Sequence, residues 1–345
     1  MNDKQLMNRA ADNIRVLAVS MVEKANSGHP GGAMGGADFI NVLFSEFLVY
    51  DPDDPMWTGR DRFFLDPGHM SPMLYAALTL RGMFSMDDIK QFRQWGSPCP
   101  GHPELDVVHG IENSSGPLGQ GHAIAAGAAV AEKFLEARLG KTMMQHTIYC
   151  YISDGAVEEE ISQGVGRIAG TLGLNNLIMF YDANEVQLST DTKEVMAENT
   201  AMKYKAWNWN VIEINGNDVD EIRGALREAK MEQDRPTLII GHTVMAKGAL
   251  KADGSSYEGS VKTHGAPLGD EAYRNTVVHL GGNPDDPFVI WDDVKQLYDR
   301  RREELRNIVR QRRTAEHQWR ESNPELAAQM DDWFSNKVPK VDFSN

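Results

Sequence analysis

HTIYCYIS, residues 146–153, is an apolar run that predicts a buried strand, and NLIMFYD, residues 176–182, predicts a second one. Two further runs follow, NVIEIN at 210–215 and TLIIGHTV at 237–244. Buried strands that alternate with helices indicate an α/β fold with a doubly wound, mostly parallel sheet and helices on both faces. Right-handed crossovers place the loops after these strands along one edge, where ligands bind in such sheets.

Outward from these strands, helical patterns begin near Glu158 and run from about Asp218 to Glu232. Asp3 is a candidate cap for a first helix. Residues 25–121 are rich in Gly and Pro, which suggests several loops that approach a ligand closely. From about Trp291 the chain is highly charged and predicts a solvated helix. We expect one domain over residues 1–285, and a helical extension and inter-domain linker over 286–345.

Composition excludes several classes of protein. The net charge of −15 argues against a general nucleic-acid-binding surface. The two cysteines, Cys99 and Cys150, do not support a disulfide framework or a Cys-based zinc site. The N-terminal residues contain no apolar core of a secretion signal, and no apolar stretch is long enough to span a bilayer. A reducing, cytoplasmic setting without a membrane partner is therefore expected.

Polar residues follow the first two strands. Ser153-Asp154-Gly155 ends one strand, and Asn184 lies thirty positions after Asp154 where the next strand ends. A carboxylate, an amide oxygen and a backbone carbonyl suit Mg²⁺, with diphosphate oxygens and water as the remaining ligands. Gly155 lets its N–H approach a phosphate at the start of a helix. Asp154 alone would more simply cap that helix, but the accompanying Asn184 favours the metal site.

Four of the ten histidines lie in Gly/Pro-rich loops: His29, His69, His102 and His264. A neutral imidazole can donate to phosphate or hydroxyl oxygens and can relay protons near pH 7. A single loop histidine is usually an ordinary surface residue, whereas four in such loops favour a shared polar pocket. Their spacing does not match a zinc site.

The motifs SGHPGG, RDRFFLDPGH, QFRQWGSPCPGHPE, NSSGPLGQG, SDG…YDAN and THGAPL occur here in the order found in transketolases. The chain resembles that family from about residue 10 to about residue 335. The resemblance implies a thiamine-diphosphate-binding fold and the cofactors thiamine diphosphate and Mg²⁺, with Ca²⁺ as a possible substitute. It implies transfer of a two-carbon ketol unit from a ketose phosphate donor to an aldose phosphate acceptor, within the pentose phosphate pathway.

The resemblance also implies roles for individual residues. Asp154, Asn184 and the carbonyl of Val186 would bind Mg²⁺. The N–H of Gly155 and the side chains of His69 and His264 would contact the diphosphate.

Other implied roles concern the rings of the cofactor and the sugar. Gly116 and Leu118 would lie against the aminopyrimidine and thiazolium region. His29 and His102 would contact sugar hydroxyls, and Arg93 matches an arginine near the substrate channel. The implied catalytic residues are His29, His102, His264 and Glu159.

This sequence departs from the family pattern around its metal motif. Ser153 replaces the first Gly of the usual GDG, and YDAN replaces the commoner YDDN. Glu159 matches a glutamate at the family's dimer interface, but Glu160 replaces a glycine and Gly164 replaces a second glutamate. These changes put a carboxylate relay between active sites in doubt and leave the metal residues intact. The stretch 243–265, which ends in the first residues of THGAPL, is also longer than the family pattern predicts.

Members of the family are roughly twice this length, and their second domain binds and activates the aminopyrimidine. No residues after 335 would encode that domain, so we expect a half-site that is inactive alone. It would need the C-terminal half in cis or in trans, as a truncated piece of a longer protein or as one subunit of a split enzyme. A homodimer is expected by analogy.

Alternatives stay open within and outside this cofactor class. A deoxyxylulose-phosphate synthase or a 2-oxoacid dehydrogenase component would share the Asp-Gly…Asn pattern, but not the joint presence of PGHPE and THGAPL. A different class is a non-catalytic module that binds diphosphate or a partner chain for assembly.

Overall fold

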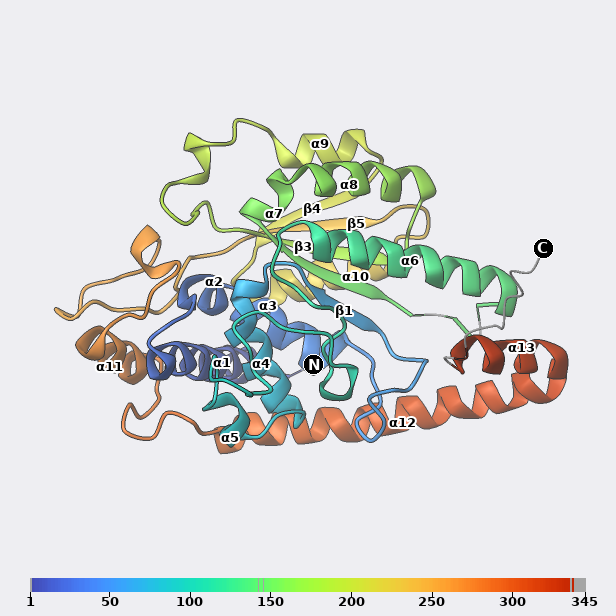
Figure 1. Cartoon of the computed structure of the whole chain (residues 1–345), viewed down its shortest axis with the longest axis horizontal. Helices are drawn as coiled ribbons and strands as arrows, with labels where there is room; N and C mark the ends of the chain where they lie inside the picture. The colour runs from blue at the N-terminus through green and yellow to red at the C-terminus, as the bar shows by residue number, and fades with distance from the viewer. Residues whose placement is uncertain (1, 142, 145, 336, 338–345) are drawn as a thin grey trace, which may run out of the picture.

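A computed structural model describes residues 2–141, 143–144, 146–335 and 337. Its centre is a five-stranded parallel sheet in the order β1-β2-β3-β5-β4. The strands are β1 (Arg62–Leu65), β2 (Ile148–Ser153), β3 (Leu177–Ala183), β4 (Asn210–Asn215) and β5 (Thr237–His242). The parallel, doubly wound sheet that the apolar runs predict is confirmed, and Figure 1 shows its helices on both faces.

The edge strand β1 is absent from the sequence prediction, which treats this region as loops. It contains only four residues, too few for a periodic signal. It forms because its backbone pairs with β2, with Phe64 opposite Cys150. Its side chains also complete both cores, since Phe64 packs with the core on one face and Phe63 and Leu65 with the core on the other.

Two helical layers cover the sheet (Figure 1). One face packs against α6 (Gln120–Leu139), α8 (Glu160–Leu172) and α9 (Thr200–Ala206). The opposite face packs against α1 (Lys4–Ala25), α3 (Ala37–Val42), α4 (Ser71–Arg81) and α10 (Val219–Met231). Successive side chains of a strand point to opposite faces, so Cys150 and Met179 join the first core while Tyr151 and Phe180 join the second.

Shorter elements connect these layers: α2 (Pro30–Gly35), η1 (Leu43–Phe47), η2 (Gly68–Met70), α5 (Met86–Ile89), η3 (Val107–His109), α7 (Asp154–Glu158), η4 (Thr192–Glu194), η5 (Val261–Thr263) and α11 (Asp270–His279). Asp3 and Asp218 accept hydrogen bonds from the first turns of α1 and α10. The cap at Asp3 is predicted, whereas for Asp218 the sequence predicts only that a helix begins near it. In place of the single helix predicted from near Glu158, the structure has two helices. A single turn, α7, begins at Asp154, and α8 begins only at Glu160 because Glu159 is extended.

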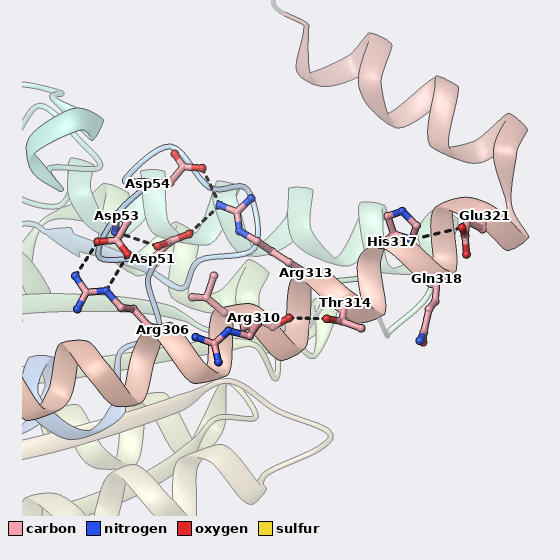
Figure 2. A pocket seen from close by; sticks show the side chains of 11 residues that line it. Asp51, Asp53, Asp54, Arg306, Arg310, Arg313, Thr314, His317, Gln318 and Glu321 are labelled. Carbon is pink, nitrogen blue, oxygen red and sulfur yellow. Dashed lines mark hydrogen bonds and ion pairs between the residues drawn. The ribbon is translucent and has the colours of Figure 1, made fainter.

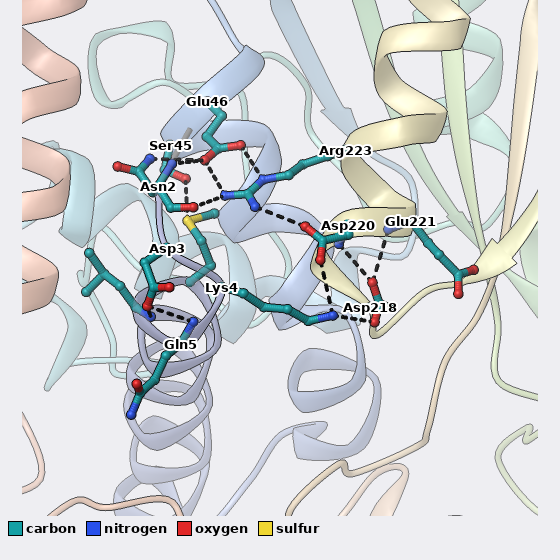
Figure 3. A network of polar contacts seen from close by, with 12 residues as sticks. Asn2, Asp3, Lys4, Gln5, Ser45, Glu46, Asp218, Asp220, Glu221 and Arg223 are labelled. Carbon is teal, nitrogen blue, oxygen red and sulfur yellow. Dashed lines mark hydrogen bonds and ion pairs between the residues drawn. The ribbon is translucent and has the colours of Figure 1, made fainter.

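The N-terminal residues are fastened to the body by a polar network (Figure 3). Arg223 of α10 donates to both carboxylate oxygens of Glu46, at 2.8 and 2.6 Å, and to the carbonyl of Asn2 at 2.8 Å. Lys4 forms ion pairs with Asp218 and with Asp220, the latter a first-turn residue of α10. Because the Arg223 side chain is buried, its bidentate contact with Glu46 fixes α10 against η1, and its bond to Asn2 holds the residues before α1.

The charged C-terminal segment forms α12 (Asp292–Ser322) and α13 (Pro324–Phe334). The prediction of a solvated helix is wrong for one face of α12, which buries Leu297, Tyr298 and Leu305 against the body. Figure 2 shows two arginines of α12 reaching the 51–54 loop. Arg306 donates to both oxygens of Asp53, and Arg313 contacts Asp51 and Asp54. The predicted division at residue 285 stays a prediction.

The described part of the chain contains no helix with both the length and the apolar character needed to cross a membrane. Cys99 and Cys150 are both buried and free.

Candidate cofactor and metal site

The carboxyl ends of β2 and β3 bring the predicted metal residues together. Ser153 lies opposite Asp182 in the sheet register, so Asp154 and Asn184 emerge side by side from the same edge. The backbone N–H of Asn184 donates to Oδ2 of Asp154 at 3.3 Å. This contact joins the Asp154 carboxylate to the backbone of Asn184, so the two predicted ligands are neighbours at this edge.

Neighbouring groups orient these oxygens. The hydroxyl of Tyr181 donates to Oδ1 of Asp154, while the amide nitrogen of Asn184 donates to Asp182 at 3.3 Å. Because that nitrogen is held by Asp182, Oδ1 of Asn184 is turned toward Val186, whose N–H it accepts at 3.1 Å. Tyr181 and Asp182 belong to the quoted YDAN motif, but their supporting role was not predicted, because it depends on the register of β3 beside β2.

Burial raises the pKa of Asp154 to about 7, and the nearby Asp182 carboxylate adds to the rise, whereas the Tyr181 hydrogen bond opposes it. Burial also raises the pKa of Asp182 to about 6. A cation at Asp154 would favour its charged form. Among the described residues no group of three or more His, Cys, Asp or Glu side chains is arranged to hold a metal. The oxygen set of one carboxylate, one amide and one backbone carbonyl fits Mg²⁺ only if further oxygens come from a bound ligand and water.

Three of the four predicted histidines form a cluster from distant parts of the chain. The ring centroids of His29 and His69 are 5.0 Å apart, those of His29 and His264 5.7 Å, and those of His69 and His264 5.4 Å. His29 precedes α2, His69 lies in η2, and His264 follows η5. The three imidazoles are therefore half-buried and lie together, whereas the sequence predicts a pocket shared by all four histidines.

These imidazoles are neutral at pH 7. The pKa of His69 is lowered to about 3, mainly by burial. Repulsion from nearby histidines in their protonated form lowers it further. The pKa of His29 is lowered to about 4, again mainly by burial. Positive charge on His264, Arg93 and His102 lowers it further. Burial likewise lowers the pKa of His264, whose buried Nδ1 has no hydrogen-bond partner among the residues that the structure describes. Such a partnerless atom suits a polar ligand that a neutral ring would bind by hydrogen bonding.

The predicted substrate residues lie beside this cluster. Arg93, which has a positive φ of 61°, donates to the hydroxyl of Ser27 at 2.8 Å and approaches Nδ1 of His29 at 3.5 Å. His102 is exposed on the following loop. A cavity of about 900 Å³ opens between these residues and Trp95, whose side chain is fully exposed.

The remaining predicted residues surround the metal and histidine groups. A Cβ added to Gly155 would lie 2.9 Å from Leu118, and one added to Gly116 would lie 3.8 Å from the ring of His102. The loop that carries Gly116 and Leu118 therefore spans from the metal residues to the substrate residues. Glu159 is exposed at the start of α8, near Gly119 of the same loop.

Asp154 and Asn184 follow β2 and β3, and His69 follows the parallel neighbour β1, so the predicted cation ligands and the histidine cluster both lie at the carboxyl edge of the sheet. The family model described as "Transketolase, thiamine diphosphate binding domain" matches residues 6–339. The chain therefore belongs to the transketolase family, in its thiamine diphosphate binding domain.

Relatives agree with this assignment. The chain is 43% identical over 305 residues to the chloroplastic transketolase-1 of Arabidopsis thaliana, covering 86% of this chain and 40% of that protein. The transketolase structure from Leishmania mexicana matches with a TM-score of 0.92 at 35% identity, over 97% of this chain and 50% of that one. A Pichia stipitis transketolase in complex with sedoheptulose-7-phosphate matches with a TM-score of 0.90 at 32% identity, over 97% and 49%. The chain thus spans half or less of these relatives.

Proposed function

We propose that this chain supplies the metal- and diphosphate-binding half-site of a transketolase. The observation that carries the proposal is the contact between Asp154 and Asn184 beside the cluster of His29, His69 and His264. A cation site and a set of neutral hydrogen-bond donors at one sheet edge suit a metal-bound diphosphate.

In this proposal Asp154, Asn184 and the carbonyl of Val186 hold Mg²⁺, or Ca²⁺ in its place. The N–H of Gly155, at the start of α7, and the rings of His69 and His264 donate to diphosphate oxygens. Thiamine diphosphate, when bound, supplies the carbon nucleophile that carries a two-carbon ketol unit between sugar phosphates.

Sugar phosphates are the proposed substrates. The Pichia stipitis relative binds one of them, sedoheptulose-7-phosphate. Here Arg93 and His102 lie beside the cluster, and together with His29 they would hydrogen-bond to sugar hydroxyls. His29 and His264, neutral and close together, are suited to accept and return protons at those hydroxyls without adding a fixed charge.

A homodimer is the proposed assembly, and the outer face of α6 and α8 is its proposed interface. Large apolar side chains are exposed there: Ile124, Val130 and Phe134 on α6, and Ile161, Ile168 and Leu172 on α8. The two helices pack together, so these side chains lie on neighbouring helices, and exposed apolar side chains gathered in this way mark candidate interfaces. Glu159, at the start of α8, would lie at the rim of this interface.

The activity also requires a pyrimidine-binding half, in cis or in trans. We place the protein in the cytoplasm and in the pentose phosphate pathway, which fits its two free, buried cysteines.

The test is activity on xylulose 5-phosphate plus ribose 5-phosphate, with and without a separately produced C-terminal half. We expect no activity from the chain alone and measurable activity from the mixture. Absence of any rescue, with both halves folded, would instead favour a non-catalytic diphosphate-binding or assembly module.

A further inference from the structure

Asp66 is a buried carboxylate directly after β1 that the proposed chemistry does not use. Its side chain has no exposed surface, and both of its oxygens accept backbone hydrogen bonds from one segment. Oδ1 accepts from the N–H of Gly119 at 2.9 Å, and Oδ2 accepts from the N–H of His122 at 2.8 Å. Burial raises its pKa to about 6, which is still below 7. Both oxygens also face N–H donors, so the group is charged at pH 7.

This carboxylate caps a helix that cannot cap itself. The N-cap residue of α6 is Gly119, which has a positive φ of 82° and no side chain. Asp66, which directly follows β1, supplies the missing acceptor, and its negative charge also suits the positive end of the twenty-residue helix. The fit is tight, because a Cβ on Gly121 would lie 2.6 Å from Cα of Asp66.

The same residue fixes both ends of the loop before α6. The hydroxyl of Ser115 donates to the carbonyl of Asp66 at 2.8 Å, and the side chain of Asn113 pairs with the N–H and C=O of Leu65 at 3.2 Å each. Gly116 and Leu118 lie between Ser115 and Gly119, which Asp66 holds through its carbonyl and its carboxylate. The carbonyl of Asp66 also accepts from the N–H of Gly68, in the turn that presents His69.

We propose that Asp66 is a positioning residue that holds the 113–119 loop against the ring portion of bound thiamine diphosphate. This inference rests on the proposed function. The diphosphate and its cation are bound by Asp154, Asn184 and the histidines, none of which Asp66 contacts by a hydrogen bond. Loss of Asp66 should therefore weaken recognition of the rings selectively and leave recognition of the diphosphate unchanged.

Calorimetry with two ligands separates these contributions. Asp66→Asn keeps the size of the side chain but replaces one acceptor oxygen with a donor that faces an N–H. With Mg²⁺ present, we expect about a tenfold loss of affinity for thiamine diphosphate, as for a lost charge-assisted hydrogen bond. Affinity for inorganic diphosphate should stay within about twofold of the unmutated chain.

Asp61 provides a matched control at the opposite end of β1. It is also buried, and it also accepts two backbone hydrogen bonds, from Val49 and Thr147 at 2.9 Å each. Asp61→Asn should lower the melting temperature as Asp66→Asn does, yet leave the ratio of the two ligand affinities unchanged. If Asp66→Asn does not fold, Ser115→Ala removes the other loop anchor, with an expected loss of about threefold for thiamine diphosphate only.

The outcomes are distinct. The role of Asp66 would be overturned if Asp66→Asn lost equal affinity for both ligands or lost none for either. It would also be overturned if Asp61→Asn changed the ratio of the two affinities in the same way. It would also be overturned if the unmutated chain bound inorganic diphosphate as tightly as thiamine diphosphate. If the unmutated chain bound neither ligand, the proposed function itself would be wrong.

Discussion

The hydroxyl of Tyr181 donates a hydrogen bond to the carboxylate of Asp154, although 27 positions separate them in the chain. Tyr181 lies on β3, whereas Asp154 follows the neighbouring strand β2. The bond stabilises the charged carboxylate, which burial and Asp182 disfavour. It leaves Oδ2 of Asp154 on the side of Asn184, where the proposed cation lies.

Asp154→Ala should abolish Mg²⁺-dependent binding of inorganic diphosphate, because it removes the only charged protein ligand in the proposed set. Calorimetry with and without Mg²⁺ measures this. Asp285→Ala, a change at an exposed aspartate paired with Arg274, is the control and should leave binding unchanged. Unaltered binding in Asp154→Ala would mean that the metal lies elsewhere.

Tyr181→Phe should weaken Mg²⁺-dependent diphosphate binding about fivefold while leaving the site assembled. The lost hydrogen bond no longer stabilises the charged form of Asp154, and one such bond contributes about 1 kcal/mol. Titrating Mg²⁺ at fixed diphosphate measures the change, and the deficit should shrink as the pH rises. A deficit that is independent of pH would contradict the proposed electrostatic role.

His29→Ala and His102→Ala should impair the enzyme reconstituted with a C-terminal half, chiefly by raising the KM for sugar phosphates. Affinity for thiamine diphosphate should change little, because the proposed diphosphate contacts come from His69 and His264. Steady-state kinetics and calorimetry on the same variants measure the two quantities. An equal loss of both would assign His29 and His102 to the diphosphate instead.

His69 should make the chain less stable in mild acid. Its pKa is about 3 in the folded chain against the usual 6.5, so the unfolded chain takes up a proton near pH 6.5 that the folded chain refuses. The contribution of His69 to the free energy of unfolding is therefore fully present above about pH 6.5, and it is lost as the pH falls toward about 3.

The comparison with His69→Gln isolates this contribution from the raised pKa values of Asp66 and Asp154, which act in the opposite direction. Between pH 7 and pH 5, the unfolding free energy of the unmutated chain should fall relative to the variant by on the order of 1–2 kcal/mol. Urea unfolding at both pH values measures the difference. A difference that stays constant would show that His69 titrates normally.

Ile168→Asp should convert the proposed dimer into a monomer, because it places a charge in the apolar face of α6 and α8. Light scattering coupled to size-exclusion chromatography measures the mass. Val278→Asp, at a comparably exposed apolar residue of α11, is the matched control and should not change the mass. If the unmutated chain were itself a monomer, this face would not be a dimer interface in the isolated half.

Local signals in the sequence were sufficient for most of the sheet. The strands β2 and β3 are continuous apolar runs, and Asp218 and Trp291 directly precede the helices predicted there. By contrast, β1 is too short to produce a pattern, and its position depends on pairing with a strand more than eighty positions later. Glu159 separates α7 from α8 through its backbone conformation, which a helical pattern does not reveal.

The sequence by itself determined the strand-and-helix alternation and the position of Asp154 and Asn184 at two strand ends, because both follow from chain-local periodicity and from the parallel direction of the strands. Only the tertiary structure decided which histidines cluster, with His29, His69 and His264 in ring contact, and that Asp66, directly after β1, caps α6. The physical reason is that these contacts join residues far apart in the chain. Their geometry depends on how the layers pack, and no local pattern encodes it.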